Sequence, residues 1–143
     1  MAGMVIAVCV SKEKGERKTP SESVHLRENH GIIGDAHAGD WHRQVSLLAL
    51  ESIAKMQKLG LDVGPGDFAE NLTTQGIDLV NLPIGTLLGI GAVQLEISQI
   101  GKVCHTRCAI FYQAGDCVMP KEGVFAKVVS GGIIRPQDEI QLL

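Results

Sequence analysis

The chain has 143 residues, of which 45% are hydrophobic, 3% aromatic and 20% charged, and its net charge at pH 7 is −3. This length suits one domain that buries an aliphatic core without the help of disulfides or metals. The acidic balance argues against a nucleic-acid-binding protein, and no apolar stretch reaches the roughly 18 residues of a membrane span.

The N-terminal segment predicts a strand followed by a loop. Residues 1–10 are apolar but lack the basic region and cleavage site of a signal peptide, so we expect a first strand, a cytoplasmic location and reduced cysteines. Cys9 lies in this run and is expected in the core. Residues 11–23 are polar and contain Pro20, which predicts a flexible surface loop.

The rest of the chain predicts many short strands and one helix. Glycine is abundant, at 17 residues, and favours tight turns. A helix is expected over residues 50–59, stopped by Gly60, and residues 31–40 are expected as a loop. Residues 92–98 alternate apolar and polar side chains, as a half-buried strand does. The expected strands after the first cover residues 24–27, 44–48, a segment within 68–74, and residues 86–90, 92–98, 124–129, 133–134 and 139–143, the last three as a closing meander.

This succession predicts a mainly β (α+β) fold. Short strands joined by glycine turns, with one or two helices, favour a closed or nearly closed barrel. Closure would leave no exposed strand edges. We expect residues 1–143 to form a single domain.

Cys104 is the strongest candidate for chemistry, because it follows the strand expected over residues 92–98. Lys102, His105 and Arg107 flank it, and positive neighbours lower the pKa of a thiol and favour the thiolate. A thiolate is both a nucleophile and a soft metal ligand. The spacing alone leaves open a cysteine that is simply buried and idle.

Three of the four cysteines are close together in the sequence, which leaves a zinc site open. Cys104 and Cys108 have an acceptable spacing for two zinc ligands, and His105 and Cys117 could complete the set. Structural zinc sites usually show two close pairs, whereas Cys117 stands alone. A zinc-binding or interaction module therefore remains an alternative.

A glycine-rich loop holds His37 and His42 beside Asp35, Asp40 and Arg43. The histidines could ligate a metal, relay protons or hold an anion, although a loop histidine is more often solvated. Arg43 is a better candidate for a phosphate contact, because its planar guanidinium pairs with phosphate through two hydrogen bonds.

Asn71 follows a Gly-Pro-Gly turn and could either satisfy loop backbone or contact a ligand, the structural role being the commoner one. The chain has no G-x-G-x-x-G, P-loop or G-x-S-x-G motif. This absence argues against dinucleotide binding, nucleotide hydrolysis and serine-hydrolase chemistry.

Taken together, these motifs resemble the MOSC domain, the C-terminal domain of molybdenum cofactor sulfurases. The resemblance follows the order of the chain and covers nearly all of it. It is most specific in the combination of the Gly-Asp-x-His motif, the Glu-Asn-Leu-Thr motif and the cysteine at position 104. The chain is most similar to short stand-alone bacterial members. The matching segments are residues 31–39, 43–48, 68–73, 84–85, 90–91 and 102–104.

The resemblance implies a barrel-like fold that binds a molybdenum–molybdopterin cofactor or carries sulfur in metal–sulfur or cofactor metabolism. Cys104 would ligate molybdenum or bear a persulfide. Cys108 and Cys117 lie outside the general family pattern. The remaining residues of the implied cofactor site are His37, His42, Arg43, Asn71, Lys102, His105 and Arg107.

The implied partners are the cofactor and separate proteins that donate or accept sulfur or electrons. Some relatives reduce N-hydroxylated compounds, so a sulfurtransferase-like activity and a molybdenum-dependent oxidoreductase both stay open. The sulfurases also contain a domain that binds pyridoxal phosphate. A chain of 143 residues has no room for that domain, so no pyridoxal phosphate is expected here.

Overall fold

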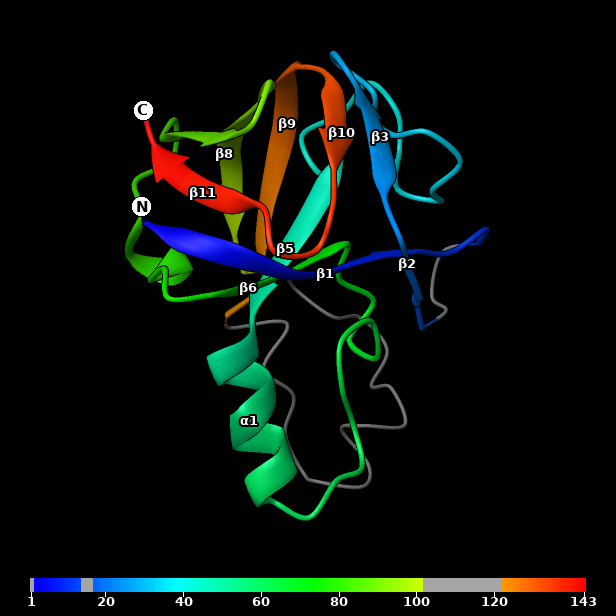
Figure 1. Cartoon of the computed structure of the whole chain (residues 1–143), viewed down its shortest axis with the longest axis vertical. Helices are drawn as coiled ribbons and strands as arrows, with labels where there is room; N and C mark the ends of the chain where they lie inside the picture. The colour runs from blue at the N-terminus through cyan, green and yellow to red at the C-terminus, as the bar shows by residue number, and fades with distance from the viewer. Residues whose placement is uncertain (1, 14–16, 102–121) are drawn as a thin grey trace.

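The computed structural model describes residues 2–13, 17–101 and 122–143, and within them a closed β-barrel dominates the structure (Figure 1). One α-helix, α1 (Leu50–Lys58), and one short 3-10 helix, η1 (Leu79–Asn81), accompany it. The strands are β1 (Gly3–Val10), β2 (Thr19–Ser21), β3 (Val24–Arg27), β4 (Gly31–Ile32), β5 (Val45–Ala49), β6 (Leu72–Gln75), β7 (Leu87–Ile90), β8 (Val93–Ile100), β9 (Val124–Ser130), β10 (Gly132–Ile134) and β11 (Glu139–Leu142).

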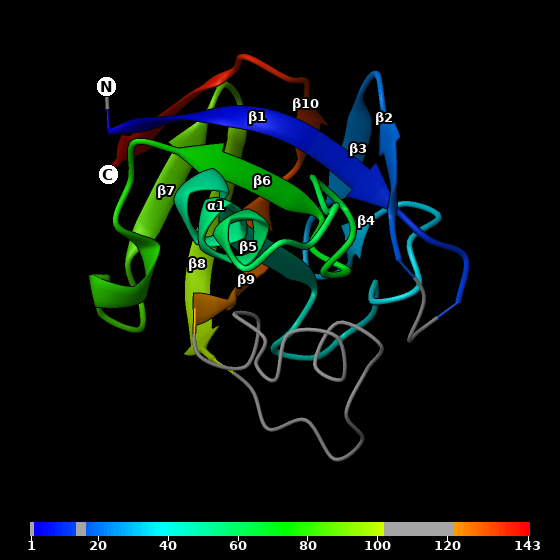
Figure 2. The ribbon, with the colours of Figure 1, turned by 90° about the horizontal axis from the view of Figure 1, so that it is seen from below.

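Seven strands close the barrel in the order β11-β7-β8-β9-β5-β6-β1. Pairing of β1 with β11, with Gly3 opposite Ile140, completes the ring and brings the two ends of the chain side by side (Figures 1 and 2). β5 and β6 pair in parallel, β2 extends the sheet beyond β1, and β3, β4 and β10 form a separate small sheet. The predicted mainly β, barrel-like fold is confirmed.

Alternating side chains of the barrel strands form the main core. Val93, Leu95 and Ile97 of β8 are fully buried, while Gln94 between them is exposed, as the alternation in the sequence predicts. Burying an aliphatic side chain of this size contributes about 1.5–3 kcal/mol. The core is therefore filled by aliphatic side chains, in keeping with the scarcity of aromatic residues.

The helix α1 covers one end of the barrel, where Figure 2 shows it end-on in front of β5. Its buried residues Ile53 and Met56 pack with Phe125 and Leu48 in a second apolar cluster. The helix ends before Gly60, whose φ of 93° lies in the left-handed region that glycine adopts most easily. The expected helix is thus confirmed to within one residue. Among the described residues, no helix is long and apolar enough to cross a membrane.

The predicted closing meander is wrong. β9 pairs with β5 and β8, β10 pairs with β3 in the small sheet, and β11 pairs with β7 and β1. The turns between these strands were expected correctly, but a turn fixes only where the chain reverses. Which strands pair with each other is determined by long-range packing, and the alternation of apolar and polar residues within one strand does not predict it.

The predicted surface loop over residues 11–23 is also partly wrong. It contains β2, which pairs antiparallel with β1, and it contains the buried side chain of Lys18. All three residues of β2 are exposed, and Pro20 is tolerated because β2 is an edge strand. The exposed edge strand β2 therefore has the polar composition that is typical of a loop, which is why the sequence did not predict it.

Candidate functional site

A buried ion pair lies beside the end of β1. Lys18 Nζ is 2.9 Å from Asp35 Oδ1, and neither side chain is exposed to solvent. The backbone N–H of Ser11 donates to Asp35 Oδ1, and that of His37 donates to Asp35 Oδ2, each at 3.0 Å. Burial raises the pKa of Asp35, but the hydrogen bonds and the charge of Lys18 outweigh it and hold this pKa below its usual value. Asp35 is therefore a carboxylate at neutral pH.

The position of Lys18 depends on a close approach between two loops. Its backbone N–H donates to the carbonyl of Gly66 at 2.8 Å. Gly66 has a φ of 90°, and a Cβ atom there would collide with the carbonyl oxygen of Lys18. Only glycine allows this contact without a shift of the backbone. Lys18 was missed by the sequence analysis, because nothing local distinguishes it from the exposed charges around it.

His37 lies directly against the ion pair. Its Nδ1 is 3.0 Å from Lys18 Nζ, and its side chain is 17% exposed, so the ring reaches the surface of the site. The indole N–H of Trp41 donates to the carbonyl of His37 at 2.7 Å. The two rings are parallel, with centroids 6.4 Å apart. Residues 35–41 thus fold around the buried carboxylate.

Trp41 brings three of the predicted site residues together. Besides stacking with His37, it meets His42 edge-on, with ring centroids 5.7 Å apart. The guanidinium carbon of Arg43 lies 4.7 Å from the centroid of the Trp41 ring, a cation–π distance. The sequence analysis missed Trp41, although it is the single tryptophan of a chain poor in aromatics and stands directly before His42 and Arg43.

Arg43 carries a buried donor that no described residue accepts a hydrogen bond from. Its guanidinium carbon also lies 5.7 Å from the ring centroid of Phe125, so the group contacts two aromatic rings. Its Nε is buried and has no hydrogen-bond partner among the residues that the structure describes. Leaving a buried donor unpaired is unfavourable. The arrangement therefore suits an anionic ligand that would accept a hydrogen bond from this atom.

Asn71 lies in the interior and ties three segments together. Its Oδ1 accepts hydrogen bonds from the backbone N–H of Ser46 at 3.0 Å and from the Ser46 hydroxyl at 3.1 Å. Its Nδ2 donates to the carbonyl of Cys9 at 3.1 Å. The side chain is fully buried, so Asn71 holds β5, β1 and the start of β6 in place. Its predicted contact with a cofactor stays a prediction.

The two sequence motifs meet at the end of β1. Asn71 of the Glu-Asn-Leu-Thr motif is fixed to Cys9, and Asp35 of the Gly-Asp-x-His motif is fixed to Ser11, two residues further along. Motifs more than 30 residues apart in the sequence are thereby joined through one strand.

Glu70 and Cys9 are two further buried residues in this region. Glu70 accepts hydrogen bonds from the Gly66 N–H at 3.1 Å and from the Thr73 hydroxyl at 2.8 Å. Burial raises the pKa of Glu70, although these hydrogen bonds oppose the rise. Burial and the charge of Glu70 raise the pKa of the Cys9 thiol to about 12. Cys9 is therefore an unreactive core thiol, as its apolar sequence context predicts.

His42 connects the loop to the barrel. Its side chain is exposed, and its carbonyl accepts a hydrogen bond from the hydroxyl of Ser98 on β8. Beyond β8, the N–H of Gly101 donates to the carbonyl of Gly123 at 2.6 Å. The remaining predicted site residues, and the two additional cysteines, lie outside the described residues: Lys102, Cys104, His105, Arg107, Cys108 and Cys117.

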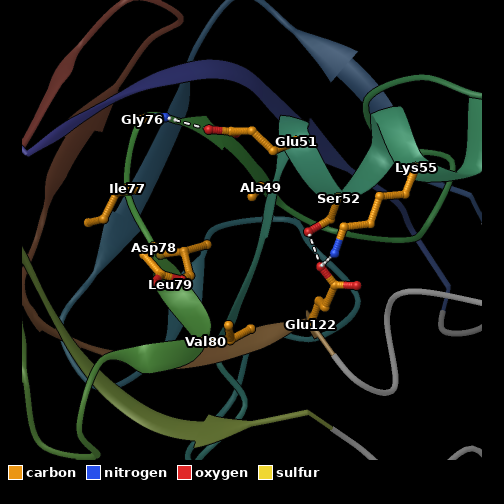
Figure 3. A pocket seen from close by; sticks show the side chains of 10 residues that line it. All are labelled: Ala49, Glu51, Ser52, Lys55, Gly76, Ile77, Asp78, Leu79, Val80 and Glu122. Carbon is orange, nitrogen blue, oxygen red and sulfur yellow. Dashed lines mark hydrogen bonds and ion pairs between the residues drawn. The ribbon is translucent and has the colours of Figure 1, made fainter.

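A separate open cavity of about 430 Å³ lies between α1 and the segment after β6 (Figure 3). Lys55 Nζ and Ser52 Oγ each lie 2.8 Å from Glu122 Oε1, and Glu51 accepts a hydrogen bond from the Gly76 N–H. None of the described predicted site residues lines it. Over the described part of the chain, no three His, Cys, Asp or Glu side chains are grouped in a way that could hold a metal ion.

Comparisons with known proteins place the chain in a family. The family model of the MOSC domain matches residues 34–141. The fold is similar to the crystal structure of the YuaD protein from Bacillus subtilis, with a TM-score of 0.81 and 17% identity over 98% of this chain and 94% of that one. It is also similar to YiiM from Geobacillus stearothermophilus, with a TM-score of 0.73 and 18% identity over 99% of this chain and 75% of that one.

YiiM from Escherichia coli has a TM-score of 0.69 and 20% identity, over 100% of this chain and 70% of that one. At these identities the three structures establish the fold alone. A search of curated proteins found no match. The family match covers most of the barrel and includes both the Gly-Asp-x-His and the Glu-Asn-Leu-Thr motifs, and it confirms the resemblance seen in the sequence: the chain belongs to the MOSC domain family.

Proposed function

We propose that the chain binds a molybdenum–molybdopterin cofactor or carries sulfur on Cys104, acting in the cytoplasm as one domain with separate sulfur-donor, sulfur-acceptor or electron-donor proteins. MOSC domains are associated in general with the molybdenum cofactor, which supports the class of ligand. In this proposal Cys104 is the molybdenum ligand or the bearer of a persulfide.

The observation that carries the proposal is the Nε donor of Arg43, which has no partner among the described residues. A guanidinium that contacts the rings of Trp41 and Phe125, with a buried Nε that has no acceptor among the described residues, fits the phosphate of the pterin. Arginine pairs with phosphate through two parallel hydrogen bonds, which are stronger than those between neutral groups. His37 and His42 contact the same tryptophan ring and would border the bound group.

The remaining residues of the proposed site come from the sequence. Lys102, His105 and Arg107 flank Cys104 and would offset the negative charge of the phosphate and the dithiolene sulfurs. Asn71 would hold the loops that border the cofactor. When bound, molybdenum would supply the redox chemistry that the family resemblance implies.

As a sulfur carrier, the chain would use the thiolate of Cys104 directly. The thiolate attacks the outer sulfur of a donor protein's persulfide, a new S–S bond forms on Cys104, and the donor leaves as a thiolate. The exchange has no net oxidation and needs no further reactant. Its rate depends on the thiolate fraction of Cys104, which the basic neighbours in the sequence would raise.

The test compares gently purified wild type with Cys104→Ser and with Cys9→Ala as the matched cysteine control. Intact mass spectrometry detects an added sulfur atom, and elemental and pterin analysis of the same samples detects bound cofactor. We expect persulfide or molybdopterin in the wild type and in Cys9→Ala, and its loss in Cys104→Ser. Equal cofactor or sulfur content in all three proteins would contradict the proposal, as would stoichiometric zinc without pterin.

A further inference from the structure

The ammonium of Lys18 has one acceptor for each of its three N–H groups. Nζ lies 2.9 Å from Asp35 Oδ1, 3.0 Å from Ser11 Oγ and 3.0 Å from His37 Nδ1. A lysine ammonium has three donors and no acceptor. The Ser11 hydroxyl gives its own proton to the carbonyl of Glu13 at 3.1 Å, so its oxygen accepts from Lys18. His37 Nδ1 is the third acceptor.

The shared proton belongs to the lysine in this contact. An imidazolium is ordinarily a stronger acid than a lysine ammonium by about four pKa units. The Asp35 carboxylate lies 2.9 Å from Nζ, so the lysine ammonium is paired with a buried negative charge. Nδ1 of His37 therefore keeps its lone pair, and the ring proton of the neutral imidazole is on Nε2.

We propose that Lys18 and Asp35 are a positioning pair that holds His37 in the tautomer protonated on Nε2, so that His37 serves the site as a hydrogen-bond donor. The inference deepens the proposed function, on which it rests for the nature of the ligand. It assigns no metal-ligand role to Nδ1, because that atom accepts a hydrogen bond from a buried cation.

The donor role of His37 matches that of its neighbour. Arg43 carries five N–H donors and no acceptor, and it contacts the same Trp41 ring as His37. Two donor groups next to one aromatic ring select a ligand rich in acceptors, such as a phosphate or a sulfur anion. A metal cation without acceptor atoms would face the positive charge of Arg43.

The experiment measures the tautomer on the cofactor-free chain. In protein labelled with ¹⁵N in its histidines, long-range ¹H–¹⁵N spectra distinguish a protonated ring nitrogen from an unprotonated one. Spectra of His37→Gln identify the His37 signals by their loss, and the exposed His25 gives a reference position for a ring in solvent. We expect the proton on Nε2 and a hydrogen-bonded, unprotonated Nδ1.

Two variants test whether Lys18 is the cause. In Lys18→Met the Nδ1 signal should move to the position of an unprotonated nitrogen that accepts no hydrogen bond, whereas Lys58→Met, which changes an exposed lysine, should leave it in place. Lys18→Met leaves Asp35 buried without its counterion and could fail to fold. Lys18→Met/Asp35→Asn removes both charges, so it leaves no buried charge unpaired, and it supplies the same measurement.

A proton on Nδ1 in the wild type, or an unmoved Nδ1 signal in the double variant, would overturn the inference. A chain that shows the expected tautomer but takes up neither molybdopterin nor sulfur would contradict the proposed function alone. The two failures are therefore distinguishable.

Discussion

Lys18 and Asp35 form an ion pair with an N–O distance of 2.9 Å in which neither side chain is exposed. The pair joins a segment with the composition of a surface loop to the Gly-Asp-x-His motif. The pair also contacts the His37 ring, because Lys18 Nζ lies within hydrogen-bond distance of His37 Nδ1. The stability of the fold and the geometry of the proposed site consequently depend on the same two charges.

Removing one charge of this pair should be strongly destabilising. We expect Lys18→Met to lower the free energy of unfolding by about 3–5 kcal/mol, because it leaves a buried carboxylate without its partner. The exposed Lys58→Met should change it by less than about 0.5 kcal/mol. Urea unfolding of the three proteins measures both effects. Equal stability of the two variants would show that the pair does not stabilise the fold.

Glu70 should make the protein less stable as the pH rises. Its pKa is raised in the folded state, so the folded chain binds the proton more tightly than the unfolded chain does. Its contribution to stability is therefore present below the unfolded pKa of about 4.3 and is lost as the pH rises through the folded pKa. The free energy of unfolding of Glu70→Gln should lack this decline, and the exposed Glu22→Gln should retain it. Parallel pH profiles of all three proteins would rule the effect out.

Asn71→Ala should loosen the contact between β1, β5 and β6. The variant leaves the N–H of Ser46 and the carbonyl of Cys9 without the hydrogen bonds that Asn71 supplies. We expect a loss of about 1–3 kcal/mol in the free energy of unfolding for each buried group left unpaired. Asn81→Ala, at an exposed position in η1, is the matched control. A loss no greater than that of the control would mean that water or a rearrangement replaces these bonds.

Cys9 should resist thiol reagents in the folded protein. With a pKa of about 12 and a fully buried side chain, it has almost no reactive thiolate at pH 8. Labelling with iodoacetamide followed by peptide mapping should modify Cys9 only after urea is added. Native-state labelling of Cys9 at the rate of a free thiol would contradict the burial and the raised pKa.

Local patterns in the sequence predicted the elements better than their arrangement. The alternation of Val93, Leu95 and Ile97 identified β8. The spacing of Leu50, Ile53 and Ala54, with the stop at Gly60, identified α1. These features arise from contacts within a few residues. The partner of β10 depends on the closure of the whole barrel, and no local feature of residues 132–134 expresses it.

The candidate site was predicted through its motifs and missed where a residue acts through long-range contacts. Arg43 and the two loop histidines were identified, and the structure gathers them around Trp41. Lys18 escaped detection because its burial is created by Asp35 and by the loop at Gly66. The role of Cys104 stays a prediction, since this residue lies outside the described part of the chain.

The most direct test of the central proposal is the affinity of the purified chain for molybdopterin, followed by pterin fluorescence. We expect saturable binding by the wild type and by Arg27→Gln, an arginine variant on the exposed side of β3. Arg43→Gln should bind about 10- to 100-fold more weakly, as the loss of a charge-assisted hydrogen bond implies. Equal affinity of Arg43→Gln and Arg27→Gln, or no binding by the wild type, would contradict the assignment of this site to the cofactor.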